Sequence, residues 1–280
     1  MEIQPLGGCG AIVEGLALAD ARGDDLDALR RELAMHGLLV FRDQALSPDD
    51  HLGFARQLGE IVVNKFFPVD GLHPEIAEVR KEKEQKTNIG GGWHADHSYD
   101  AEPALGSILV ARELPSSGGD THFANLADAY DALSDGFKQM LGSLRAVHSN
   151  HHLYGPQGIY RKTDLADQLG GESEAGEAVH PVVIRHPESG RAVLYVNPGH
   201  TIQIEGWSIP ESRALLDFLY AHVTESGFTT SLEWAPGSVA IWDNRQTWHL
   251  ADNDYHGERR LMHRITLAGE ALSPASGPTG

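Results

Sequence analysis

Residues 90–98 read GGGWHADHS and place an imidazole and a carboxylate two positions apart, directly after three glycines. In an extended strand, side chains two residues apart point to the same face, so His94 and Asp96 can reach one point together. A His and an Asp that converge in this way form half of a site for a divalent metal. The glycines allow a sharp turn or a close approach of the backbone to a ligand. The alternative is a surface His and Asp beside an ordinary loop.

The second half of the predicted site lies far along the chain. Residues 238–249 read SVAIWDNRQTWH and predict a strand, a turn and then a histidine, His249. A ligand this distant in sequence is typical of a jelly roll, in which strands from opposite ends of the chain meet. Two histidines and one carboxylate leave three positions open on an octahedral Fe(II), which oxygen chemistry requires. We therefore predict that His94, Asp96 and His249 converge on one metal.

Two arginines follow this histidine on one predicted strand, residues 259–267. Arg260 and Arg264 share a face of that strand because they are four residues apart. Two guanidinium groups on an inward face cost free energy unless anions meet them. Arginine can clamp a carboxylate or a sulfonate through paired hydrogen bonds. The alternative is a pair of salt bridges to some of the chain's many acidic residues.

Composition limits the classes of partner. The chain has 280 residues, of which 41% are hydrophobic and 22% are charged, as expected for a globular protein with a large core. A formal net charge of −18 argues against nucleic acid or an anionic membrane as the main partner, but not against a small anionic substrate. The single cysteine, Cys9, excludes an intrachain disulfide framework and a cysteine-rich zinc site, whereas 16 histidines fit imidazole-based metal chemistry.

Two further features bear on location. The N-terminus lacks the basic and apolar segments of a signal peptide, and no apolar stretch approaches transmembrane length. We expect a cytoplasmic protein with no membrane contact.

The predicted secondary structure contains five helices, two of them early in the chain, and many short strands. Ser47 and Pro48 are typical of a helix start, and Ser208 caps another helix. The predicted helices are 24–36, 48–58, 125–133, 135–144 and 208–225. The predicted strands lie within 3–18 and at 38–41, 76–79, 106–111, 120–123, 179–186, 192–197, 228–234, 238–243 and 259–267. Helices and strands do not alternate regularly, so the pattern favours an α+β fold built around a β-sandwich or jelly roll over a doubly wound fold.

One long stretch, at about 148–178, differs from the rest because it is rich in histidine, glycine and glutamate. A loop of this length inside a domain is usually functional or disordered. We predict a single domain over residues 1–270 with a mobile lid at about 148–178, followed by a flexible tail at 271–280.

Four motifs together resemble the taurine dioxygenase/TfdA-like family of Fe(II)- and 2-oxoglutarate-dependent dioxygenases. They are WHAD at 93–96, GGDT at 118–121, WDNR at 242–245 followed by His249, and RLMHR at 260–264. The resemblance extends over roughly residues 10–269. It implies a double-stranded β-helix (jelly-roll) core flanked by helices.

The resemblance also implies cofactors and their ligands. His94, Asp96 and His249 would bind Fe(II), and Arg260 would clamp the far carboxylate of 2-oxoglutarate with help from the Thr121 hydroxyl. Asn88 is a further candidate contact to this cosubstrate. Such an enzyme consumes O2 and 2-oxoglutarate, releases succinate and CO2, and hydroxylates a C–H bond. Halogenating relatives lack the carboxylate ligand, so the presence of Asp96 favours hydroxylation.

Candidate substrate contacts follow in part from the same resemblance. Arg264 would hold the anionic end of the substrate near the metal. The chain departs from the family pattern at Asn64, where the family has a histidine, and at His97, where it has a small apolar residue. His152 and Tyr154 lie where the family places part of its substrate lid, although an exposed polar loop is the alternative. Five other histidines are not expected to be ligands: His122, His180, His186, His200 and His256.

These observations together predict a dioxygenase that hydroxylates a small organic acid. A sulfonate, a sulfate ester, an aryloxyalkanoate and an amino-acid-like anion all remain open as substrates. The resemblance further implies a homo-oligomer, either a dimer or a tetramer. Two alternatives are a cupin-like metal-dependent binding protein and a metal hydrolase, neither of which would turn over 2-oxoglutarate.

Overall fold

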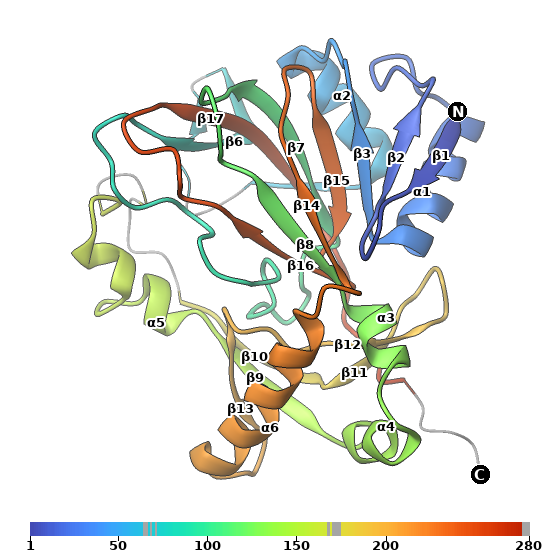
Figure 1. The fold of residues 1–280 in the computed structure, drawn as a ribbon, viewed down its shortest axis with the longest axis vertical. Coiled ribbons are helices and arrows are strands. Elements are labelled where there is room, and N and C mark those ends of the chain that lie inside the picture. The colour runs from blue at the N-terminus through green and yellow to red at the C-terminus, as the bar shows by residue number, and fades with distance from the viewer. Residues whose placement is uncertain (64–66, 68, 71, 167–168, 170–174, 276–280) are drawn as a thin grey trace.

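The largest sheet forms the centre of the fold (Figure 1). The structure is a computed structural model that describes residues 1–63, 67, 69–70, 72–166, 169 and 175–275. Within these residues the sheet has nine strands in the order β1-β2-β3-β15-β7-β17-β6-β5, with β4 beside β17. They are β1 (Glu2–Pro5), β2 (Ala11–Glu14), β3 (Leu38–Phe41), β4 (Ile61–Val62), β5 (Val69–Asp70), β6 (His73–Lys81), β7 (Gly106–Glu113), β15 (Val239–Asp243) and β17 (Arg260–Leu267). Neighbours are antiparallel except β2 and β3, which are parallel.

Two helices cover one face of this sheet. α1 (Asp24–His36) and α2 (Pro48–Leu58) have the bounds that the sequence predicted, and Figure 1 shows them beside β1, β2 and β3. Ser47 and Asp50 close a reciprocal capping box at the start of α2. The apolar faces of both helices pack on the sheet side chains Ile108, Ile241 and Ile265. Each fully buried side chain of this size contributes roughly 1.5–3 kcal/mol, so this layer stabilises the packing of the helices on the sheet.

A smaller sheet packs on the other face and completes the jelly roll. Its strands run in the order β14 (Thr229–Leu232), β8 (Thr121–Asn125) and β16 (Thr247–Ala251). Phe123 of this sheet packs with Leu109, Trp242 and Met262 of the large sheet. The two layers agree with the predicted α+β jelly-roll class.

The remaining elements form a third region at the opposite end from α2 in Figure 1. They are α3 (Leu126–Asp131), α4 (Asp135–Leu141), β9 (Arg145–Ser149), α5 (His151–Tyr154), η1 (Ile159–Lys162), β10 (Glu177–Pro181), β11 (Val183–Arg185), β12 (Ala192–Leu194), β13 (Thr201–Ile204) and α6 (Ile209–Val223). The single strand predicted at 179–186 is two strands, β10 and β11. Strands β9 and β13, which pair with each other, were not predicted.

The predicted lid begins where β9 ends. Its described part contains α5 and η1, and the Asp164 carboxylate accepts hydrogen bonds from the backbone N–H groups of Lys86 and Thr87. This segment therefore lies against the loop that precedes residues 90–98.

Residues 271–275 of the predicted tail are described, and Ser273 and Ala275 hydrogen-bond to Arg185 and Val183 of β11. Residues 167–168, 170–174 and 276–280 lie outside the described residues, so the mobile lid, the flexible end of the tail and the single domain stay predictions. In the described part of the chain, no helix is long and apolar enough to cross a membrane.

A buried histidine makes stability depend on pH. Burial and the neighbouring His180 lower the pKa of His148 on β9 to about 3, against about 6.5 in the unfolded chain. Because the folded-state pKa is depressed, the stability that comes from keeping His148 neutral is complete above pH 6.5. It is lost as the pH falls from 6.5 towards 3. Between pH 7 and pH 5, the free energy of unfolding should therefore fall by about 2 kcal/mol less in His148→Phe than in wild type. Urea unfolding at both pH values measures this, with exposed His256→Phe as control, and equal losses in all three proteins would contradict it.

Candidate metal centre and substrate pocket

The two predicted histidine ligands lie side by side because their backbones pair. His94 and His249 form an isolated antiparallel bridge. The His94 N–H donates to the His249 carbonyl at 3.1 Å, and the His249 N–H donates to the His94 carbonyl at 2.9 Å. His249 itself lies in β16, which pairs with β8. The bridge thus joins the GGGWHADHS segment to the small sheet and leaves the two ring centroids 4.1 Å apart.

The Asp96 carboxylate completes a trio. One of its oxygens lies 3.7 Å from His94 Nε2 and the other lies 3.4 Å from His249 Nε2. The three ligand atoms all fall within 4.8 Å of one another, and the side chains are largely buried. Two imidazoles and one carboxylate at this separation form a donor set for a divalent transition metal such as Fe(II).

The hydrogen bond of His94 shows which of its nitrogens can bind a metal. His94 Nδ1 lies 2.7 Å from the Gly92 carbonyl oxygen, which can only accept, so Nδ1 carries the proton. The lone pair of Nε2 then faces Asp96. Fixing one ring nitrogen with a carbonyl is a common way to orient a histidine ligand. The residues present therefore fit an iron ion.

Charge favours a metal at this place. Burial alone would raise the pKa of Asp96, but the charges of Arg264, His249 and His94 lower it below its ordinary value. Burial, together with His94, lowers the pKa of His249 well below its ordinary value. The trio therefore presents a carboxylate anion, and its buried His249 ring favours the neutral form, the states that coordinate a cation.

The route by which His94 and Asp96 converge differs from the expected extended strand. Only His94 makes a β-bridge, and the chain turns from Asp96 onward. His97 has a φ of +58°, a left-handed backbone that is strained for a residue with a side chain. The two ligands therefore lie where a bridge residue leads into a turn, and not along one continuous strand.

A glycine is required beside His94, as the sequence suggested. Gly90 has a φ of +80°, and a Cβ there would lie 3.2 Å from His94 Cε1. Its carbonyl accepts a hydrogen bond from the Ala251 N–H, which continues the pairing between this segment and β16. Gly90 therefore satisfies both predicted roles, the turn and the close approach.

Arg260 is a buried cation whose charge is only partly used. It is 5% exposed, and its Nε and Nη2 atoms have no hydrogen-bond partner among the described residues. Burial lowers its pKa, while Tyr255 and Asp120 act in the opposite direction. A Cβ on Gly119, at a φ of +76°, would lie 3.3 Å from Arg260 Nε, so this glycine leaves room beside the guanidinium. An anion is the partner that such a group lacks.

Thr121 is linked to this arginine through Trp234. Trp234 Nε1 donates to Thr121 Oγ1 at 2.9 Å, and the Trp234 ring lies 5.8 Å from the Arg260 guanidinium carbon. Because the threonine oxygen already accepts this bond, its own O–H can donate to another acceptor. The unpartnered guanidinium nitrogens and the hydroxyl donor fit the far carboxylate of 2-oxoglutarate.

Arg264 lies against the trio. Its Nη2 is 2.7 Å from an Asp96 oxygen, an ion-pair distance without the directions of a hydrogen bond. Its Nε donates to Ser107 Oγ at 3.1 Å. The position next to the trio agrees with the role expected for Arg264, although in this structure the guanidinium also faces Asp96.

A pocket with an empty volume of about 660 Å³ opens beside the trio. Its lining includes the predicted substrate contacts His97, Tyr154 and Arg264, together with Phe67, Tyr99 and Tyr160. His152 is not part of this lining. Its Nε2 instead lies 2.9 Å from the carbonyl oxygen of Gly199, a residue that does line the pocket. Asn64 lies outside the described residues.

Asn88, the further candidate for cosubstrate binding, holds the backbone. Its Nδ2 donates to the Ala251 and Asp252 carbonyls at 2.9 and 3.1 Å. These bonds tie the loop before Gly90 to the end of β16. Contact between Asn88 and the cosubstrate stays a prediction.

His200 is one of several pocket residues that were not among the predicted site residues. His200 lines the pocket, and its ring lies edge-on to His94 with 6.3 Å between centroids. Burial and His94 lower the pKa of His200 well below its ordinary value. The signal that could have identified it is the Asn-Pro-Gly turn at 197–199, which follows the predicted strand 192–197 and places His200 in a connecting segment, where binding residues often lie.

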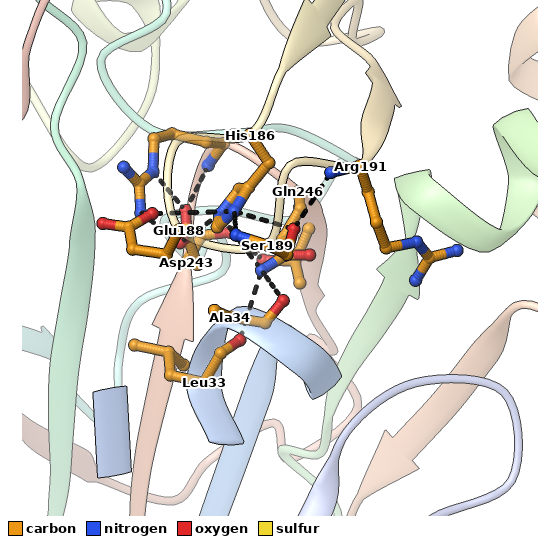
Figure 2. Close-up of polar contacts among 10 residues, drawn as sticks. Leu33, Ala34, His186, Glu188, Ser189, Arg191, Asp243 and Gln246 are labelled. Atoms are coloured by element: carbon orange, nitrogen blue, oxygen red, sulfur yellow. Dashed lines mark hydrogen bonds and ion pairs between the residues drawn. The ribbon is translucent and has the colours of Figure 1, made fainter. Parts of the chain in front are cut away.

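A second cluster, of His186, Glu188 and Asp243, has similar residue types, but its side chains are already engaged in hydrogen bonds (Figure 2). His186 Nε2 lies 2.9 Å from an Asp243 oxygen, and His186 Nδ1 accepts a hydrogen bond from the Ser189 N–H. Arg245 donates to both Asp243 oxygens and to Glu188. Burial would raise the pKa of Asp243, but Arg245 and His186 lower it. The lone pairs that a metal needs are already in use, so this cluster is a charge network and not a metal site.

Comparisons with known proteins agree with the geometry. A family model described as "Taurine catabolism dioxygenase TauD, TfdA family" matches residues 2–266. The alpha-ketoglutarate-dependent sulfate ester dioxygenase of Pseudomonas putida is 34% identical, over 96% of this chain and 90% of its own. The alkylsulfatase of Acinetobacter baylyi is 35% identical, over 98% of this chain and 86% of its own. The crystal structure of a taurine dioxygenase from Burkholderia xenovorans is 32% identical with a TM-score of 0.81, over 99% of this chain and 93% of its own.

Removal of the Asp96 carboxylate tests which of the two clusters binds the metal. Asp96→Ala should weaken Fe(II) or Co(II) binding by more than about 100-fold, since even outer partners of metal ligands contribute about 10- to 100-fold. His186→Ala, in the second cluster, should leave metal affinity within a few-fold of wild type. Anaerobic titration followed by Co(II) absorption measures both. Equal metal affinity in wild type and Asp96→Ala would remove Asp96 from the ligand set.

Proposed function

Because the chain belongs to the TauD/TfdA family and is a 2-oxoglutarate-dependent non-haem iron dioxygenase, we propose that it oxidises a sulfate ester. The observation that carries this proposal is the pocket beside the His94–Asp96–His249 trio, which combines one cation, Arg264, with an aromatic wall. Two relatives of similar length, named for a sulfate ester and for an alkyl sulfate, support the choice.

The chain's own residues bind and orient the reactants. Bound Fe(II) and 2-oxoglutarate supply the oxidising chemistry, in which O2 and the 2-oxo acid give succinate, CO2 and one oxygen atom for a C–H bond. His94, Asp96 and His249 hold the metal. Arg260 and Thr121 hold the far carboxylate of the cosubstrate by charge-assisted hydrogen bonds in a buried site.

The substrate pocket positions an anion and its carbon chain. Arg264 pairs with the sulfate group, and the side chains of Phe67, Tyr99 and Tyr160 exclude water around the alkyl part. Hydroxylation of the carbon bonded to the ester oxygen gives a product that breaks down to an aldehyde and free sulfate. The overall balance is sulfate ester, 2-oxoglutarate and O2 in, and aldehyde, sulfate, succinate and CO2 out.

Several finer assignments belong to the same proposal. His97 and Tyr154 contact the substrate from the pocket wall, and His152 acts from the lid. Asn64, which lies outside the described residues, is kept as a further substrate contact. Closure of the segment at about 148–178 over the pocket would shield the reaction from water. We also retain the proposals of a cytoplasmic location and of a dimer or tetramer.

A sulfonate is the second candidate substrate, because a taurine dioxygenase shares the fold at 32% identity. The two candidates release different ions, since C–S cleavage yields sulfite and C–O cleavage yields sulfate. A hydrolase would also yield sulfate, but without O2 or 2-oxoglutarate.

These outcomes give a direct test. With Fe(II), 2-oxoglutarate and hexyl sulfate, the protein should release sulfate, succinate and hexanal in equal amounts, and none of them should form without O2. Ion chromatography and aldehyde derivatisation measure the products. Succinate and sulfite from taurine, with no reaction of hexyl sulfate, would contradict the sulfate ester and favour the sulfonate. Sulfate release that is independent of O2 would indicate hydrolysis.

The cosubstrate assignment has its own test. Arg260→Ala should raise the dissociation constant for 2-oxoglutarate roughly 10- to 150-fold, the value of one to two hydrogen bonds to a charged group. Arg260→Lys keeps the charge but not the paired donors, so it should fall between Ala and wild type. Anaerobic titration of the Fe(II) protein, followed by the visible charge-transfer band, measures this. Unchanged affinity in Arg260→Ala would place the carboxylate elsewhere.

A further inference from the structure

His200 is a polar side chain in the pocket that the proposed function leaves unused. It is 5% exposed and lines the pocket together with Arg264 and Tyr154. Its Nδ1 atom is fully buried and has no hydrogen-bond partner among the described residues. Buried polar atoms are nearly always paired in folded proteins, so a partner is missing.

The ring is held in place from several sides. The His200 N–H donates to Asn197 Oδ1 at 2.8 Å, and its carbonyl accepts from the Ser149 N–H at 2.8 Å. The Tyr99 ring lies edge-on at 4.9 Å between centroids. Because backbone and ring are both fixed, the imidazole has a defined direction, as in a preorganised binding group.

The turn that carries His200 also lies directly against the metal trio. A Cβ on Gly199 would lie 2.6 Å from His94 Cβ. His200 nevertheless stands outside the trio, whose three ligand atoms fall within 4.8 Å of one another. His200 therefore lines the pocket beside the trio without belonging to the ligand set.

We propose that His200 is a substrate-binding residue that donates a hydrogen bond to an oxygen of the substrate's anionic head group. This inference rests on the proposed sulfate ester function. A sulfate group offers only acceptors, several of them, and Arg264 alone cannot satisfy all of them because one of its nitrogens bonds Ser107. The imidazole of His200 supplies one further N–H donor in the same pocket.

Matched substitutions can separate this role from simple packing. His200→Phe keeps the ring and its contact with Tyr99 but removes both nitrogens. His200→Gln loses the ring but keeps an N–H donor. His256→Phe is the control, because His256 is exposed and lies outside the pocket.

The measurement is anaerobic binding of hexyl sulfate to the Fe(II)- and 2-oxoglutarate-loaded protein, by calorimetry and by the change in the charge-transfer band. We expect His200→Phe to raise the dissociation constant for hexyl sulfate about 10- to 100-fold, with 2-oxoglutarate affinity within twofold of wild type. His200→Gln should recover part of the loss. Unchanged binding of hexyl sulfate, or an equal loss for hexyl sulfate and 2-oxoglutarate, would overturn the inference.

The same titrations distinguish a failure of the proposed function from a failure of the role proposed for His200. Wild-type protein that binds taurine but not hexyl sulfate contradicts the sulfate ester. The sulfonate also offers only acceptors, so weaker taurine binding in His200→Phe still supports the role of His200. Unchanged taurine binding in that variant overturns it.

Discussion

The antiparallel bridge between His94 and His249 is the contact on which the site depends. Its two hydrogen bonds join a glycine-rich loop to the small sheet. The bond from Ala251 to Gly90 and the two bonds from Asn88 extend the same junction. Without this pairing the two imidazoles would have no common position, because His94 lies outside the helices and strands of the described chain.

Once the histidines are adjacent, electrostatics decides what the site can bind. The buried Asp96 stays ionised because Arg264 lies at 2.7 Å and two histidines lie nearby. Arg264 therefore faces two anions in turn, the Asp96 carboxylate and the head group of the proposed substrate. A cation held by the trio would compensate Asp96 and leave the guanidinium more available to the substrate. We therefore expect the metal to bind before the anionic substrate.

The local signals in the sequence predicted local structure well. The bounds of α1 and α2 follow from acidic starts, the Ser47–Pro48 cap and terminal glycines, all of which act within one turn of helix. The strands β9 and β13 escaped prediction because their pairing joins residues more than 50 positions apart and leaves no local mark. At the site, the chemistry of His94 and Asp96 was predictable, but the turn with a positive φ at His97 was not. His200 was missed because only the folded chain brings it beside His94.

The two clusters of histidine and carboxylate side chains show why residue spacing alone does not define a metal site. Both combine a His-x-acid segment with a distant third residue: His94 and Asp96 with His249, and His186 and Glu188 with Asp243. In the second cluster Arg245 donates to Asp243 and Glu188. His186 uses both ring nitrogens (Figure 2). In the first, the arginine approaches from one side only, and the backbone fixes one nitrogen of His94 while leaving the other open. The difference that allows metal binding is therefore the set of lone pairs that the fold leaves unpaired, which depends on long-range neighbours and not on the motif itself.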